Sequence, residues 1–117
     1  MGKPFYLTTT LPYVNADPHI GFALEMVQAD IIARYHALSG DEVFFNTGTD
    51  EHGLKNLQSA QKAGMDPQQF LDIQADKFKN LAARLGANPS VFYRTTDRER
   101  HWPGATKMWE ALAGGKP

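Results

Sequence analysis

The sequence predicts an α/β fold built around a parallel β-sheet, and three observations lead to this prediction. Short runs of aromatic and β-branched residues alternate with longer segments of helical periodicity. The helical segments are long enough to connect strands that run in the same direction. Turn-forming Gly, Pro, Asn and Asp residues separate the segments. This order of elements is typical of a parallel sheet with helical crossovers.

The first predicted element is a strand at residues 5–11, bounded by Pro4 and Pro12. A loop and a long helix follow, and Gly40 ends the helix because glycine readily adopts the left-handed conformation. Apolar residues in this helix recur at spacings of three and four and form one face: Ile20, Leu24, Val27, Ile31, Tyr35 and Leu38. A second strand is predicted at residues 43–47, which completes a βαβ unit.

A second helical region is predicted at residues 54–63, and a third helix begins at the Asp66 cap with Pro67 in its first turn. Gly86 ends this helix, and residues 91–94 form the third predicted strand. The apolar side of the third helix carries Phe70, Ile73, Phe78, Leu81 and Leu85.

Residues 96–99, with the sequence Thr-Asp-Arg-Glu, have the pattern of a capping box and predict a last helix. Because proline is not tolerated in a straight helix interior, this helix either begins near Trp102, with Pro103 in its first turn, or is kinked. Aromatic residues at helical spacing are assigned to core packing: Phe70, Phe78, Trp102 and Trp109. Three strands form a thin sheet, so we expect these residues to be part of a larger domain.

Composition excludes several classes of protein. With 42% hydrophobic and 21% charged residues, the chain is globular rather than disordered. A net charge of −1 argues against independent nucleic-acid binding. The absence of cysteine excludes disulfides and Cys-based zinc sites in this segment. There is no signal-peptide pattern and no apolar run long enough for a membrane span, so we expect a cytoplasmic protein without membrane association.

Two polar loops, at residues 12–22 and 47–53, follow the first and second predicted strands. Because ligands bind beyond the carboxyl ends of parallel strands, we expect these loops to meet at one cleft. His19 lies where the long helix begins, and a helix N-terminus with an imidazole donor suits a phosphate. Gly21 would allow a ligand to approach the backbone. Alternatively, His19 is structural or simply exposed.

Asp50 follows the second strand and is placed to bind an ammonium group through a charge-assisted hydrogen bond. The alternative is that Asp50 only caps the next helix. Asp50 and His52 do not form a metal site, because a third ligand at a recognisable spacing is missing.

Three motifs carry a resemblance to a known family. Residues 11–22, with the sequence Leu-Pro-Tyr-Val-Asn-Ala-Asp-Pro-His-Ile-Gly-Phe, resemble the His-Ile-Gly-His region of class I aminoacyl-tRNA synthetases in the form found in methionyl-tRNA synthetases. Residues 47–53 resemble the second-strand loop of those enzymes. Residues 92–97, followed by His101 and Trp109, resemble the segment before their connective insert. The similarity covers nearly the whole chain.

The resemblance implies a Rossmann-like parallel sheet with helices on both faces. Residues 1–117 would form the N-terminal part of the catalytic domain, without the connective insert, the second half of the catalytic domain or the anticodon-binding domain. The full-length ligase would use ATP to convert methionine to methionyl-adenylate and transfer the methionyl group to tRNA(Met). We expect the 117 residues alone to be inactive and not to bind tRNA strongly.

The resemblance also implies roles for individual residues. His19 would be catalytic and would bind ATP together with Gly21 and Phe22, while Leu11, Tyr13 and Asp50 would bind methionine. Mg²⁺ would accompany ATP, and zinc is expected only in the absent insert, not in this segment. Phe22 departs from the motif, whose fourth residue is histidine. A phenyl ring cannot donate a hydrogen bond to phosphate, so that contact would be lost or supplied by another group.

Two other readings remain open. The chain could belong to another class I synthetase or nucleotidyltransferase that transfers an adenylyl group. It could also be a non-catalytic α/β binding module, a reading that the Phe22 departure favours. Titration of a nonhydrolysable methionyl-adenylate analogue would separate these readings. Loss of its binding in His19→Ala and Asp50→Ala, with folding retained, would support the synthetase site.

Overall fold

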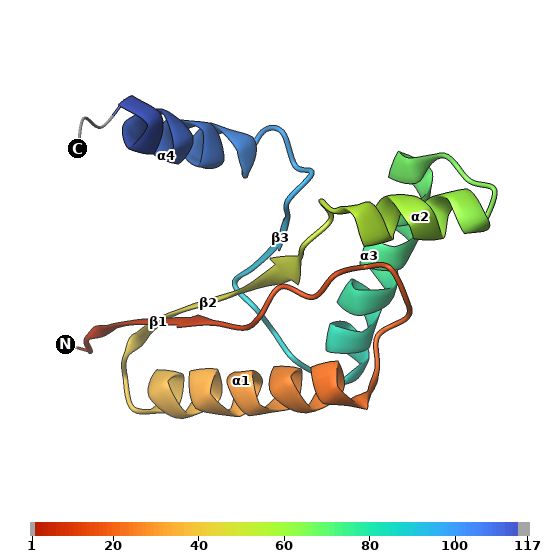
Figure 1. Ribbon diagram of the computed structural model, residues 1–117. Coiled ribbons are helices and arrows are strands. Elements are labelled where there is room, and N and C mark those ends of the chain that lie inside the picture. The colour runs from red at the N-terminus through yellow and green to blue at the C-terminus, as the bar shows by residue number, and fades with distance from the viewer. Residues whose placement is uncertain (1, 115–117) are drawn as a thin grey trace.

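The computed structural model describes residues 2–114, which form a parallel sheet and four helices (Figure 1). The strands are β1 (Pro4–Thr8), β2 (Glu42–Thr49) and β3 (Val91–Arg94), in the spatial order β1-β2-β3. The helices are α1 (Ile20–Leu38), α2 (Leu54–Lys62), α3 (Pro67–Arg84) and α4 (Trp102–Gly114). The predicted α/β class with a parallel sheet is confirmed.

The sheet has one packed face. Side chains alternate along β1, so Phe5 and Leu7 are partly buried whereas Tyr6 is 62% exposed. Phe45 on β2 lies opposite Leu7 in the register and is 1% exposed, at the centre of the core. Phe44 points to the other face and is 46% exposed. The apolar core therefore lies between one face of the sheet and the helices that cover it.

Helices α1 and α3, which contact the sheet, pack on one of its faces. The reason lies in the topology. Strands that follow one another in the same direction across a sheet, joined by right-handed crossovers, place their connecting helices on the same face. Helix α4 lies on the other side of the sheet and has no buried residue (Figure 1).

The face of α1 that packs on the sheet is not the apolar face seen in the sequence. Phe22, Met26, Ala29 and Ala33 are buried on α1. The residues of the predicted face are exposed, with the exception of the half-buried Val27: Ile20, Leu24, Ile31, Tyr35 and Leu38. Helix α1 is therefore apolar on two sides, and the small and sulfur-containing side chains face the sheet.

Helix α3 begins as predicted, because the Asp66 side chain accepts hydrogen bonds from the backbone N–H groups of Gln68 and Gln69. Phe70 and Phe78 are buried, in agreement with their assignment to the core. None of the helices described within residues 2–114 combines the length and the apolar character needed to cross a membrane.

Helix α4 differs from its prediction in two respects. The Thr96 hydroxyl bonds to Glu51 and not to the helix, and Asp97 accepts from the N–H groups of Glu99 and Arg100, so the capping box does not form. The helix begins at Trp102, and Pro103 accordingly lies in its first turn. The assignment of its tryptophans to the core is wrong: Trp102 is 39% and Trp109 71% exposed.

Candidate functional site

The loop between β1 and α1 is held in place by contacts at three points. Val14 is fully buried in the core. The backbone N–H and the hydroxyl of Thr10 donate to the Glu25 carboxylate on α1, at 2.8 and 2.6 Å. An ion pair of 2.5 Å joins Lys77 on α3 to Asp17. The loop thus has a defined course although most of its side chains are exposed.

His19 is the N-cap of α1, and its Nδ1 accepts the backbone N–H of Gly21 at 3.0 Å. A neutral imidazole that accepts at Nδ1 carries its proton at Nε2. The side chain is exposed, and no hydrogen bond to Nε2 is found within residues 2–114. The structure therefore combines the capping role of His19 with a donor that is available to a ligand.

Gly21 is needed for this arrangement. A β-carbon at position 21 would lie 2.9 Å from Cε1 and 3.0 Å from Nδ1 of His19. These distances are shorter than normal van der Waals contacts, so a larger residue would displace the imidazole ring.

The loop after β2 lies directly beside the first loop. The backbone N–H of Asp50 donates to the Pro12 carbonyl at 2.9 Å, and Tyr13 and Asp50 form a parallel bridge. The predicted meeting of the two strand-end loops is confirmed at these residues. Segments that are 38 residues apart in the sequence thus meet at the carboxyl ends of β1 and β2.

Asp50 does not cap α2, which removes one alternative reading of this residue. The N-cap of α2 is Gly53, with φ of 136°, and no side chain caps the helix. The Asp50 side chain is partly buried, and its carboxylate has no hydrogen-bond or ion-pair partner among the described residues. A carboxylate held in this way can bind a cation.

Leu11 and Tyr13 lie on the exposed side of the first loop, at 36% and 55% exposure. The Tyr13 ring lies close to Gly53, since a β-carbon on that glycine would be 3.5 Å from Tyr13 Cε1. The Tyr13 ring thus lies near Gly53, and the Tyr13 backbone pairs with that of Asp50.

Phe22 lies apart from this group. Its side chain is 5% exposed, and its ring meets Phe78 on α3 edge-on, with centroids 5.0 Å apart. The phenyl ring therefore packs α1 against α3. This placement does not support the direct contact with ATP that the sequence motif implied for residue 22.

Sequence reasoning missed a polar cluster next to Asp50. The Glu51 side chain is fully buried and pairs with Arg94 at the end of β3, with 2.6 Å between Nε and Oε1. Thr49 and Arg94 are opposite each other in the strand register. Burial does not alternate at the end of β2, where Thr47, Gly48 and Thr49 are all buried, so no alternating pattern signals that Glu51 points inward. Its partner depends on the β2–β3 register.

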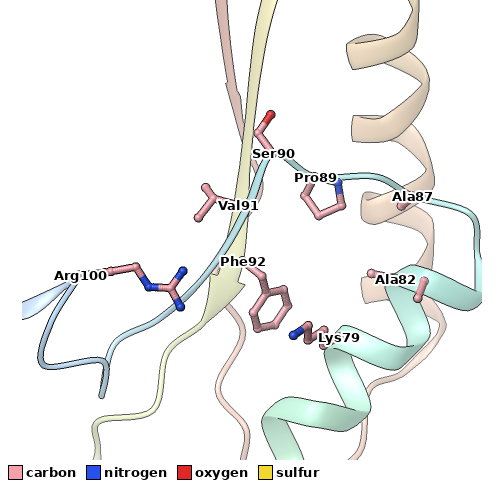
Figure 2. A pocket seen from close by; sticks show the side chains of 9 residues that line it. Lys79, Ala82, Ala87, Pro89, Ser90, Val91, Phe92 and Arg100 are labelled. Carbon is pink, nitrogen blue, oxygen red and sulfur yellow. The ribbon is translucent and has the colours of Figure 1, made fainter.

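A cavity of about 380 Å³ lies between α3 and the outer edge of β3 (Figure 2). Figure 2 shows Phe92 pointing toward Lys79 on α3, with Arg100 across the strand. Neither strand-end loop contributes a lining residue, so this cavity is separate from the site around Asp50. Over the described residues, no group of three or more metal-binding side chains is found.

Comparison with solved structures defines the class of protein. The structure is similar to Mycobacterium tuberculosis methionyl-tRNA synthetase bound by methionyl-adenylate, with a TM-score of 0.93 and 38% identity, over 96% of this chain and 22% of that one. It is also similar to a LeuRS of Agrobacterium radiobacter K84 in a ternary complex with tRNA and LeuAMS, with a TM-score of 0.87 and 27% identity, over 97% of this chain and 15% of that one. The fold is that of a class I synthetase catalytic domain.

Sequence comparison identifies the family within that class. Residues 5–115 match the family described as "tRNA synthetases class I (M)". The chain is 57% identical to methionine–tRNA ligase of Thermotoga maritima over 80% of its length, and 45% identical to that of Rhizobium meliloti over 92%. It spans 15% and 20% of these two relatives. The chain belongs to the methionine family of class I tRNA synthetases.

Proposed function

We propose that these residues form the N-terminal part of the catalytic domain of a ligase that joins methionine to tRNA(Met). The complete protein would activate methionine with ATP and then transfer the methionyl group to the 3′ end of the tRNA. The names of the relatives support methionine as the amino acid. The connective insert, the second half of the catalytic domain and the anticodon-binding domain would lie outside these residues, and the reaction would take place in the cytoplasm.

The observation that carries the proposal is the junction of the two loops. Asp50 is fixed to the first loop through the Pro12 carbonyl, yet its own carboxylate is without a partner within residues 2–114. An ammonium group bound there would form a charge-assisted hydrogen bond, worth about 1.5–3 kcal/mol. Leu11 and Tyr13 lie on the adjoining strand-end loop, and apolar and aromatic groups suit a thioether side chain. The same junction thus offers groups for both ends of methionine.

In the first step, an oxygen of the methionine carboxylate would form a bond to the α-phosphorus of ATP. The bond between that phosphorus and the bridging oxygen of pyrophosphate would break, and pyrophosphate would leave. Catalysis of this kind depends on positioning and charge stabilisation. His19 would donate from Nε2 to a phosphate oxygen, and the start of α1 would add its free N–H groups. Gly21 would leave the backbone open to the nucleotide.

Mg²⁺ would be held chiefly by the phosphates of ATP, where it would neutralise their charge. Asp50 is assigned to the amine and not to the metal, because it is the carboxylate that adjoins Tyr13. In the second step, a hydroxyl of the 3′-terminal ribose of the tRNA would attack the methionyl carbonyl carbon, and AMP would leave. Zinc would be expected only in the connective insert.

Titration of a nonhydrolysable methionyl-adenylate analogue into the complete protein that contains these residues tests the proposal. The wild type should bind it, while Asp50→Asn should bind about 10- to 100-fold more weakly, the equivalent of one charge-assisted hydrogen bond. Lys62→Gln, on the exposed end of α2, serves as a control that should not change binding. Equal affinity for the adenylate of a different amino acid would favour another synthetase, and no binding of any adenylate would favour a non-catalytic module.

The 117 residues alone should show no methionine-dependent ATP–pyrophosphate exchange. They span about a fifth of the M. tuberculosis enzyme, and further groups that would grip the triphosphate, besides His19 and the start of α1, would lie outside them. Measurement of exchange with the purified 117-residue chain checks this prediction. A methionine-dependent rate above the blank would contradict it.

A further inference from the structure

A buried carboxylate lies immediately after Asp50. The Glu51 side chain has no exposed surface, and each of its oxygens accepts two hydrogen bonds. Oε1 accepts from the Thr49 hydroxyl at 2.8 Å and from Arg94 Nε at 2.6 Å. Oε2 accepts from Arg94 Nη2 at 3.0 Å and from the Thr96 hydroxyl. The charge is therefore fully paired, as a buried ion requires.

The peptide groups on both sides of Asp50 are fixed as well. The Asp50 N–H donates to Pro12, and its carbonyl accepts from Asn56 Nδ2 at 3.3 Å. The N–H of Glu51 donates to the Thr95 hydroxyl at 2.8 Å. The backbone of Asp50 is thus connected to the first loop, to α2 and to the segment after β3.

The cluster around Glu51 extends to α3. Arg94 Nη2 also donates to Asp72 at 2.6 Å, and Asp72 is half exposed. Burial by itself would lower the pKa of Arg94, but the hydrogen bonds to Glu51 and Asp72 raise it by more than burial lowers it. The pKa of Arg94 therefore lies above its ordinary value, and the guanidinium is cationic. One arginine therefore serves two carboxylates, of which only Glu51 adjoins Asp50.

The contrast between the two neighbouring acids defines their roles. Glu51 has all of its hydrogen bonds within the protein, whereas the Asp50 carboxylate has none within residues 2–114. We propose that Glu51 is a positioning residue: anchored by Arg94 and Thr96, it fixes the backbone from which the Asp50 carboxylate is presented to the substrate amine. The nature of the substrate rests on the proposed function. The orientation of Asp50 would be fixed on folding, so that binding does not have to order it.

Steady-state kinetics in the complete protein test this role. Glu51→Gln keeps the size of the side chain but removes the charge that holds Arg94. We expect the KM for methionine to rise about tenfold or more, with kcat and the KM for ATP within about twofold of wild type, because only amine binding is affected. A side chain that serves stability alone would lower the amount of active protein and leave the KM for methionine unchanged.

Asp72→Asn is the matched control. It removes the other carboxylate on Arg94 Nη2 but leaves the contacts of Glu51 in place. We expect a lower melting temperature with an unchanged KM for methionine. Thr96→Val removes a single donor to Glu51 without changing the shape of the side chain; it should give a smaller rise in KM and replaces Glu51→Gln if that variant does not fold.

Two results would overturn the proposal: a wild-type KM for methionine in both Glu51→Gln and Thr96→Val, or an equal rise in Asp72→Asn. Hydrogen exchange separates this failure from a failure of the proposed function. If the wild type does not use methionine, the Asp50 amide should still exchange about tenfold faster or more in Thr96→Val than in wild type, with Ala33 in α1 unchanged. Unchanged exchange at Asp50 would then refute the positioning role.

Discussion

The two ring nitrogens of His19 differ: one caps α1, and we propose that the other binds a ligand. Nδ1 accepts the Gly21 N–H, and Nε2 makes no hydrogen bond within residues 2–114. Substitutions at this residue therefore need to separate helix stability from ligand binding, since the loss of an N-cap costs about 1 kcal/mol by itself.

His19→Asn and His19→Ala separate the two tasks. Asparagine is a good N-cap but does not reach as far as Nε2, so His19→Asn should keep the wild-type stability, whereas His19→Ala should lose about 1 kcal/mol. Both variants should lower kcat/KM for ATP–pyrophosphate exchange by about 10- to 100-fold, the equivalent of one hydrogen bond to a charged phosphate. Urea unfolding and exchange assays on the complete protein measure the two effects; full activity in His19→Asn would assign His19 to capping alone.

The sequence was sufficient to predict the positions of His19 and Asp50, because both follow strands of a parallel sheet and such loops gather at one edge. It was not sufficient for Glu51 and Arg94. These residues are 43 positions apart, and they meet only because Thr49 is opposite Arg94 in the β2–β3 register. Hydrophobic patterns predict where strands occur in the sequence. They do not predict the register between β2 and β3, which are linked by two helices.

At the scale of elements, β2 and β3 approach so closely that only glycine fits at one position. A β-carbon on Gly48 would lie 1.9 Å from the Tyr93 carbonyl oxygen. The Tyr93 oxygen is a backbone atom, and a β-carbon is fixed to the backbone of residue 48. Side-chain rotation therefore cannot relieve the contact.

Gly48→Ala should therefore destabilise the fold by about 3 kcal/mol or more, the upper range for overpacking. Gly104→Ala provides the control, because nothing lies within 4 Å of a β-carbon at position 104 of α4. Alanine is the better helix former, so this control should be neutral or stabilising by up to about 1 kcal/mol. Denaturant unfolding monitored by circular dichroism compares the two; a Gly48→Ala variant as stable as wild type would contradict the β2–β3 packing.

The turn between α1 and β2 holds a carboxylate, Asp41, that accepts hydrogen bonds from two neighbours. A hydrogen bond from His36 and another from the backbone of Lys3 lower the pKa of Asp41 below its usual value. Because the folded state lowers this pKa, the ionised carboxylate stabilises the fold above its unfolded pKa of about 3.9, and this contribution is lost as the pH falls through the lower folded value.

Asp41→Asn removes this titration. Relative to wild type, the variant should be less stable at pH 6. The difference between the two should shrink below about pH 4, where Asp41 of the unfolded wild type becomes protonated, and should disappear once the pH is below the lower pKa of the folded state. Thermal unfolding at pH values from 3 to 6 measures the difference. A difference that stays constant over this interval would show that Asp41 does not stabilise the fold through its charge.

At the scale of the whole molecule, the outer side of α1 is an apolar surface without a partner in the described residues. Leu24, Ile31 and Tyr35 are each at least 58% exposed there. A helix that is apolar on two sides is typical of one covered on both. The sequence pattern does not show which side of α1 faces the sheet, because both sides have helical spacing. The side with Met26, Ala29 and Ala33 is the one that packs on the sheet.

The 117-residue chain purified alone should therefore self-associate. Leu24→Glu together with Ile31→Glu should shift the chain toward monomer, because two charges replace apolar surface that faces away from the core. Gln28→Glu, also exposed on α1, adds charge without removing apolar surface and should change the assembly much less. Light scattering after size-exclusion chromatography gives the masses; a wild-type chain that is monomeric at about 100 μM would refute the prediction.

The close approach of the His19 ring to Gly21 restricts which residues related sequences can have at these two positions. The imidazole of His19 occupies the volume that a β-carbon at position 21 would need. Positions 19 and 21 are therefore not free to vary separately. A homologue with alanine at position 21 should carry a smaller or differently rotated side chain at position 19. Paired variation at these two sites across many relatives would record this shared volume, and frequent alanine at 21 beside an unchanged histidine at 19 would show that the loop backbone can open to admit both.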